Sequence, residues 1–175
     1  MHVIHAAKKY QIPSLVQRCI QYLENDLKAS NACSILDRSR FLNEKDLAKR
    51  CLDEIERNTV EALSSQDFLT VSDETLSMIL ESDLIGAMEE LKIFEKCYQW
   101  AARRVDTKTS IRDCLGKNIF KIRFPVMPVQ DFKDVVCQTN VLSRTEQLEI
   151  MNYMASPTYN AKPRGFKCEQ DCQGQ

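Results

Sequence analysis

The sequence has 175 residues, enough to bury the core of one sizeable domain, and its 24 basic and 25 acidic residues give a net charge of −1. Because these charges alternate along the chain, it lacks the basic patch that binding to nucleic acid or to an anionic membrane surface requires. No apolar stretch reaches the roughly 18 residues that span a bilayer, and no secretory signal pattern follows Met1, so we expect an intracellular, cytoplasmic protein.

Two helices are predicted at the N-terminus. The stretch "VIHAAKKYQIPSLVQRCIQYL" carries two apolar stripes at helical spacing, separated by a turn before Pro13. Proline suits the first position of a helix because its missing N–H costs nothing there. No further proline occurs before Pro125, and only two glycines interrupt this interval, which favours helix after helix.

Polar residues followed by acids predict where the next helices begin. Ser30 is expected to cap a third helix, Asn43 a fourth and Asn58 a short fifth. Ser72 is followed by two acidic residues, which the helix dipole favours, and begins a sixth.

The most regular apolar stripe runs from about Glu89 to Arg104 and places Trp100 in the core. After it, "IRFPVMPVQDF" predicts a break at Pro125 and a new helix from Pro128.

The last predicted helix begins at Ser143, with Glu146 completing a capping box. It is predicted to bury Leu148, Met151 and Met154. From residue 156 the composition shifts to proline, glycine, asparagine and lysine, which predicts a mobile tail.

Eight cysteines raise the question of disulfides. Four of them lie on the apolar stripes of predicted helices, where a free thiol behaves as a small apolar side chain: Cys19, Cys33, Cys51 and Cys97. Reduced core thiols are therefore favoured over a disulfide framework, in line with a cytoplasmic protein.

The sequence carries only weak metal signals. His2 and His5, at i and i+3, are close enough on one helix face to share a metal ion, but zinc needs three or four ligands and no further motif accompanies them. Cys168 and Cys172 in "CEQDC" have no second cysteine pair. Surface histidines and unstructured thiols are the favoured interpretations, and we predict no metal.

Motifs of known catalytic sites are also lacking. The isolated Gly86 and Gly116 form no phosphate-binding loop, and no G-x-S-x-G nucleophile elbow occurs. Glu89 and Glu90 are interpreted as solvated charges at a helix start. We predict a non-enzymatic interaction module with no cofactor, and an enzyme of unrecognised type is the least favoured alternative.

Several of these segments, taken in order, resemble the BTB-BACK proteins. "VIHAAKKYQIPSLVQRCIQYLENDL" resembles the last two helices of a BTB (POZ) domain, and "ASNACSILDRSRFLNEKDLAKRCLDEI" is similar to the helix pair called the 3-box. "LKIFEKCYQWAARR", "IRFPVMPVQDF" and "VLSRTEQLEIMNYM" resemble the BACK domain. Within the family, "NACSILDRSRF" and "IRFPVMP" are closer to the branch that ends in a PHR domain than to the kelch-repeat branch.

The resemblance implies an all-α fold of stacked helical hairpins, an α-solenoid-like BACK domain preceded by the last two helices of a BTB domain. Its expected divisions are residues 1–28 for the BTB helices, 29–58 for the 3-box-like pair, 59–155 for the BACK domain and 156–175 for the tail. In the family the first two helices pack on the strand-bearing half of the BTB domain. We therefore expect a fragment or a short isoform, with an uncovered apolar patch at Val3, Ile4, Leu15 and Ile20.

The function that the resemblance implies is that of a substrate adaptor for cullin-3 RING ubiquitin ligases, with the BACK helices positioning substrate relative to cullin. Its candidate partner-binding residues are Ile35, Leu36, Phe41 and Leu42, and packing into neighbouring helices is the competing interpretation for each. Cullin-3 is expected to bind this chain weakly, and a full-length protein is expected to form a BTB-BACK homodimer. The alternative is a non-ligase interaction scaffold or a truncated competitor of full-length adaptors.

Overall fold

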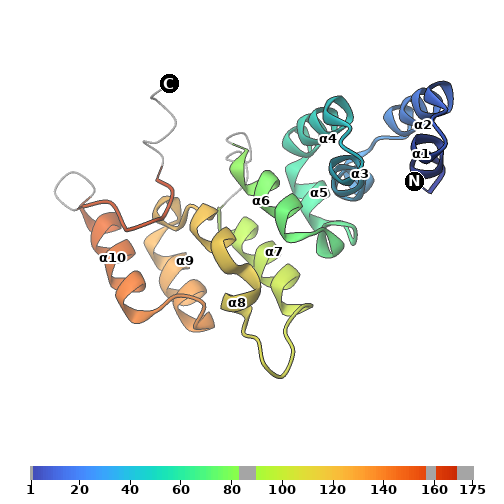
Figure 1. Cartoon of the computed structure of the whole chain (residues 1–175). Helices are drawn as coiled ribbons and strands as arrows, with labels where there is room; N and C mark the ends of the chain where they lie inside the picture. Colours follow the sequence, from blue (N-terminus) through green and yellow to red (C-terminus); the bar gives the residue numbers. More distant parts are fainter. Residues whose placement is uncertain (1, 83–89, 157–160, 169–175) are drawn as a thin grey trace. The chain divides into compact units, whose positions relative to one another are not determined.

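The computed structural model describes residues 2–82, 90–156 and 161–168, and the chain divides into two compact units, Met1–Ser82 and Asp83–Gln175 (Figure 1). All regular elements in the described residues are α-helices or short 3-10 helices, which confirms the predicted all-α fold. No helix among these residues has the length and apolar character needed to cross a membrane.

The first unit contains a helical hairpin followed by a stack of four helices. Its elements are α1 (His2–Lys9), α2 (Pro13–Asn25), α3 (Ala29–Phe41), α4 (Lys45–Arg57), α5 (Thr59–Ser64), the 3-10 helix η1 (Phe68–Thr70) and α6 (Asp73–Glu81). Helix α3 is the centre of the stack, because α4, α5 and α6 all pack against it. Leu36 on α3 is fully buried with Leu47 and Ile55 of α4.

Three of the predicted helix starts in this unit, at Pro13, Asn58 and Ser72, agree with the structure. Pro13 occupies the first turn of α2, and Ser72 caps α6 by accepting the Thr75 N–H at 3.4 Å.

The predicted caps of α3 and α4 are wrong, and Asn58 stands at the predicted start of α5 but makes no side-chain cap there. Ser30 lies inside α3, whose first turn is instead closed by Asn31, which accepts the Lys28 N–H at 2.8 Å. Asn43 has a left-handed φ of +57°, a conformation that asparagine tolerates and that ends α3 rather than starting α4. Asn58 precedes α5, but its side chain donates to Glu54 instead of capping.

The second unit is built from shorter elements. They are α7 (Glu90–Ala102), α8 (Ile111–Leu115), η3 (Gly116–Lys121), η4 (Phe124–Val126), α9 (Val129–Asp134), η5 (Val136–Thr139) and α10 (Arg144–Ala155). The predicted break around Pro125 and new start after Pro128 appear as η4 and α9.

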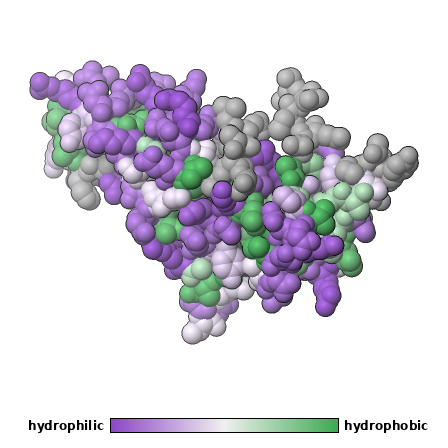
Figure 2. All heavy atoms as spheres, turned by 180° about the vertical axis from the view of Figure 1, so that it is seen from behind, coloured by the Kyte–Doolittle hydropathy of each residue, from purple (hydrophilic) through white to green (hydrophobic). Residues whose placement is uncertain are grey.

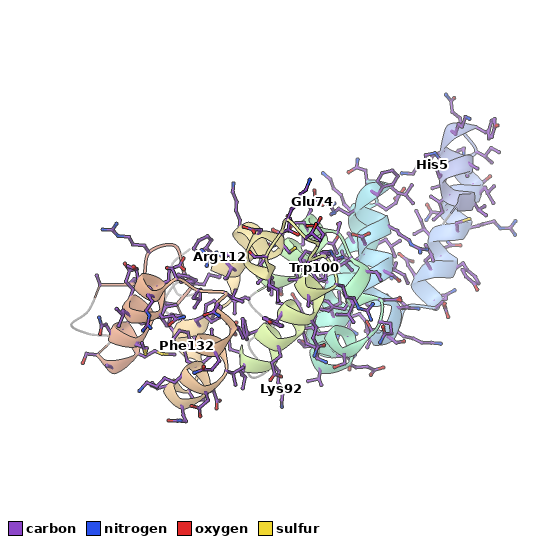
Figure 3. The ribbon with its side chains drawn as sticks, turned by 90° about the horizontal axis from the view of Figure 1, so that it is seen from below. His5, Glu74, Lys92, Trp100, Arg112 and Phe132 are labelled. Carbon is purple, nitrogen blue, oxygen red and sulfur yellow. The ribbon has the colours of Figure 1, made fainter. Side chains whose placement is uncertain are left out.

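Aromatic side chains fill the core of the second unit. Phe124 lies at its centre, with ring centroids 5.6 Å from Phe94 and 6.1 Å from Phe132, both in edge-on arrangements. Trp100 is only 1% exposed, which confirms its predicted core position, and the guanidinium of Arg104 lies 3.9 Å from its ring centroid. Figure 3 labels Trp100 and Phe132 among the side chains of this unit.

A buried ion pair joins the start of α7 to the "IRFP" segment. Glu90 accepts the backbone N–H of Arg123 at 2.7 Å and its Nε at 3.1 Å, and the two side chains are 5% and 16% exposed. The interpretation of Glu90 as a solvated charge is therefore wrong, because a partner 33 residues away encloses it. Glu89 lies outside the described residues.

The predicted capping box of α10 is confirmed, but its predicted buried face is wrong. Ser143 and Glu146 satisfy each other's backbone N–H groups. The buried side chains are Ile150 and Tyr153, whereas Leu148 is 55% exposed. Apolar residues occupy more than one face of this helix, so contacts with the rest of the unit decide its rotation.

The C-terminal residues 161–168 pack on the second unit. Phe166 and Cys168 are buried. For these residues the expectation of a mobile tail needs correction, because an aromatic side chain holds them; the other residues from 157 onward lie outside those described.

Candidate docking groove

A groove of about 600 Å³ opens in the first unit where the last turn of α3 meets α1 and the start of α6. Its lining combines charged, polar and apolar side chains: His5, Asp37, Arg38, Arg40, Phe41, Leu42 and Ser72. Figure 3 labels His5 on α1 and Glu74 on α6, which mark the two elements that flank α3 here.

Phe41 is the most exposed large apolar side chain of the groove. It lies on the final turn of α3 and is 81% exposed. The left-handed Asn43 ends the helix just beyond it, so the chain turns away into α4. The described residues of the first unit therefore leave most of this ring uncovered.

Asp37 ties the floor of the groove to α6. Its Oδ1 accepts the Ser72 N–H at 3.0 Å and the hydroxyls of Ser72 and Thr75, both at 2.6 Å. Burial alone raises the pKa of the Asp37 carboxyl, but these hydrogen bonds and the charge of Arg40 outweigh it and hold the pKa below its usual value. The floor thus carries an ionised carboxylate at neutral pH.

Cationic side chains lie on either side of this carboxylate. Arg40 pairs with Glu74 through an Nη2–Oε2 contact of 3.1 Å and donates to the Ser72 hydroxyl at 3.4 Å. Arg38 is exposed and makes no ion pair within the described residues. The groove therefore offers positively charged guanidinium groups beside its apolar edge.

The α1 wall is held by one lysine. Lys8 Nζ donates to the Leu42 carbonyl and pairs with Glu44, both in the turn between α3 and α4. This contact brings His5, one helical turn earlier on α1, to the groove.

The four predicted binding residues separate into two pairs. Leu36 is fully buried and Ile35 nearly so, which places them in the core of the unit as the competing interpretation had it. Phe41 and Leu42 line the groove. Only this second pair is available to a partner.

Sequence reasoning missed the polar members of the groove. Asp37, Arg40 and Phe41 share one face of α3 at i, i+3 and i+4, a spacing that was readable from the sequence. His5 was assessed only as a metal ligand and Ser72 only as a helix cap. Nothing local in the sequence indicates that α1 and α6 approach this face.

The apolar stripe of α2 is only partly covered within the unit. None of the 13 residues of α2 is buried. Val3 and Leu15 are exposed and Ile20 is partly exposed, as expected, whereas Ile4 is buried, because it packs inward from α1. On the face that Figure 2 shows, apolar side chains reach the surface in scattered places among hydrophilic ones.

The candidate metal ligands do not gather into a site. No group of three or more histidine, cysteine or acidic side chains with metal-binding geometry occurs among the described residues. Cys168 is buried rather than unstructured. The side chain of His2 and the whole of Cys172 lie outside what is described.

The thiols of the described chain are free. Cys33, Cys51 and Cys97 are buried and Cys19 is partly exposed. Burial raises the pKa of Cys33 and of Cys51 to about 12, so both are protonated at neutral pH. These three buried thiols act as apolar core side chains.

The sequence is similar to those of known helical-domain proteins. The BACK family, described as "BTB And C-terminal Kelch", matches residues 32–137. BTB/POZ domain-containing protein 3 of Homo sapiens is 37% identical over 153 residues, which cover 84% of this chain and 29% of the relative. BTB/POZ domain-containing protein 6 of Xenopus tropicalis is 32% identical over 153 residues, with the same two coverages.

A further relative extends the match along the chain. BTB/POZ domain-containing protein 6 of Homo sapiens is 30% identical over 167 residues, which cover 92% of this chain and 30% of the relative. The chain thus spans less than a third of the length of these relatives. No solved structure matches it significantly. The resemblance to BTB-BACK proteins is confirmed.

Proposed function

Because the chain belongs to the BACK family, we propose that it is a non-catalytic protein-interaction module, part of a substrate adaptor for a cullin-3 RING ubiquitin ligase. Its helices hold cullin-3 and a substrate-binding region at a set separation. Catalysis in such an assembly belongs to other subunits, so this chain supplies geometry rather than chemistry.

The observation that carries the proposal is the groove at the end of α3. An aromatic ring that is 81% exposed on a rigid helix end gains free energy when a partner covers it, at roughly 25 cal/mol per Å² of apolar surface removed from water. Five of the seven residues that line the groove belong to the segment that resembles the 3-box, and its volume of about 600 Å³ is large enough for several side chains of an extended peptide. We assign it to a segment of the cullin-3 N-terminal region, with Phe41 and Leu42 as the apolar contacts.

The stacked hairpins suit a spacer. Helices α3, α4, α5 and α6 of the first unit bury apolar side chains against one another, and the second unit has an aromatic core of its own. Units built in this way deform little under load because their interiors are close-packed. Each unit is therefore suited to holding a bound partner in a fixed position on its own surface.

Helices α1 and α2 fit the role of the last two helices of a BTB domain. The partly covered stripe of α2 is a surface that another part of such a domain would bury. In this proposal cullin-3 binds the chain weakly by itself and more tightly when a complete BTB domain is present, in a protein that forms homodimers. The proposal assigns no particular substrate.

Calorimetry with the cullin-3 N-terminal region tests the proposal. Phe41→Glu should weaken binding at least tenfold, because an apolar contact cannot take up an unpaired charge without a desolvation cost. Val60→Glu is the matched control, since Val60 is also exposed in the first unit but does not line the groove. A BTB-BACK relative with its complete BTB domain serves as the positive control.

The outcomes separate the candidate functions. Equal binding by the parent and by folded Phe41→Glu would remove this residue from the interface. Absence of binding even after a BTB domain is restored would overturn the ligase-adaptor proposal and favour the interaction scaffold.

A further inference from the structure

The C-terminal segment 161–168, which we call the strap, is bound to the second unit through side chains and backbone. Phe166 is 5% exposed, and its ring centroid lies 5.1 Å from that of Phe120 and 5.7 Å from that of Phe124. Since Phe124 is the centre of the aromatic core, the strap contributes one of the rings that close this core.

Backbone contacts fix the register of the strap. The Lys167 N–H donates to the Phe120 carbonyl at 3.3 Å, and the Arg164 N–H donates to Glu149 Oε2 at 3.4 Å. Between them Gly165 adopts φ +82°, and a Cβ at this position would lie 3.3 Å from the Phe120 ring. Only glycine combines this backbone conformation with so close an approach.

The surface beneath the strap is held in place independently of it. The Arg112 guanidinium lies 5.4 Å from the Phe120 ring centroid and donates to Glu146 on α10. Phe124, the second ring under Phe166, is locked between Phe94 and Phe132. The two rings under the strap therefore also have contacts with residues outside it.

We propose that the strap is an anchored connector: Phe166 and Gly165 fix residue 168 to the second unit, so that any segment following it is tethered there and not at the end of α10. This inference deepens the proposed positioning role, and its link to substrate positioning rests on the proposed function. A spacer helps to place a substrate only if the chain leaving it departs from a fixed point.

Hydrogen exchange measured along the full chain tests the anchoring directly. The amides of Arg164 and Lys167 should exchange at least about tenfold more slowly than in an unstructured peptide. Phe166→Ala should return both to the rate of an unstructured peptide. Amides of α7 and α10 report whether the second unit itself stays folded in the variant.

Gly165→Ala supplies a second variant, which keeps every aromatic side chain in the sequence. The added Cβ meets the Phe120 ring in a backbone conformation that alanine rarely adopts, so the strap should detach although Phe166 is still present. Phe41→Ala is the control, because it removes an aromatic ring from the first unit, whereas the strap belongs to the second.

Energy transfer from Trp100 measures whether the strap is held at a fixed distance from the core of the second unit. This residue is the sole tryptophan of the chain and lies in the core of the second unit. An acceptor dye attached to the strap at residue 162 should show a narrow distance distribution in the parent and a broader one in both strap variants. Fast exchange at Arg164 and Lys167 in the parent, or equal distributions in parent and variants, would overturn the proposal.

The two proposals fail separately. Cullin-3 binding is assigned to the first unit, so Phe166→Ala should leave it unchanged. Loss of cullin-3 binding by the parent would remove the ligase role but not the anchor, which exchange and energy transfer measure without any partner.

Discussion

Arg112 and Glu146, 34 residues apart in the sequence, form a two-point ion pair. Nη1 and Nη2 of Arg112 donate to the two carboxylate oxygens of Glu146 at 3.1 and 2.7 Å, and Nη1 also donates to the Val141 carbonyl at 2.9 Å. Glu146 is also the residue that closes the capping box with Ser143. One carboxylate therefore both starts α10 and fastens it to α8.

Arg112→Ala should lower the free energy of unfolding of the second unit by about 1–3 kcal/mol, because it removes charge-assisted hydrogen bonds from partly buried groups. Arg112→Lys should recover only part of this loss, since an ammonium group cannot reproduce the two-point geometry. Thermal and denaturant unfolding of both variants measures the difference. Equal stability of the lysine variant and the parent would show that charge alone, not geometry, matters.

The same pair gives the second unit a dependence on pH. Burial alone raises the pKa of the Glu146 carboxyl, but hydrogen bonds from Arg112 and Ser143 outweigh it and hold the pKa below its usual 4.5. A lowered pKa in the folded state stabilises the fold above pH 4.5, and this contribution disappears as the pH falls through the lowered value. Unfolding measured from pH 7 to pH 3 should show a smaller decline in Glu146→Gln than in the parent.

Trp100→Ala should cost about 3–5 kcal/mol, because it leaves a large cavity in the core of the second unit and removes the ring over which Arg104 lies. That is a large share of the stability of a typical domain. Near-ultraviolet circular dichroism and thermal unfolding check the loss. A melting temperature equal to that of the parent would contradict the observed packing.

Phe41→Glu should leave the melting temperature of the first unit nearly unchanged, because the ring is mostly exposed and buries little surface on folding. Leu36→Glu, only five positions earlier, should unfold the unit, since Leu36 is fully buried. Thermal unfolding of this pair separates the residue available for binding from the residue needed for folding. A large loss in Phe41→Glu would mean that the ring packs within the unit.

Asp37→Ala should loosen the tie between α3 and α6 and cost about 1–3 kcal/mol, because Ser72 and Thr75 lose the acceptor of their hydroxyl groups. Asp53→Ala on α4, in the same unit, serves as the control. Denaturant unfolding quantifies both. Similar losses in the two variants would show that the hydrogen bonds of Asp37 contribute no more than an average surface carboxylate.

Features of the fold that depend on three or four neighbouring residues could be predicted from the sequence. The capping box of Ser143 and Glu146 and the cap at Ser72 are of this kind. Asn43 shows the limit, because a polar residue before an acidic one fits both a helix start and a left-handed helix end. The burial of Glu90 depends on Arg123, 33 positions away, and no local pattern carries that information.

The groove was predictable only in part for the same reason. Phe41 and Leu42 were identified through the family resemblance, which places a binding segment at this point of the chain. The same resemblance also selected Ile35 and Leu36, since an apolar residue looks alike in sequence whether it faces a partner or a core. His5 and Ser72 join the groove through packing between distant helices.

The absence of any buried residue in α2 has a consequence for the affinity of the groove. The α1–α2 hairpin contributes His5 to the groove, and among its described side chains only Ile4 and Ala7 are buried, so we expect it to open at a lower free energy than the helices stacked around α3. A ligand that contacts both α1 and α3 binds only the molecules whose hairpin is closed. Its apparent affinity therefore falls in proportion to the fraction of molecules whose hairpin is open. Covering α2 from outside would close the hairpin and tighten the groove without touching a single residue that lines it.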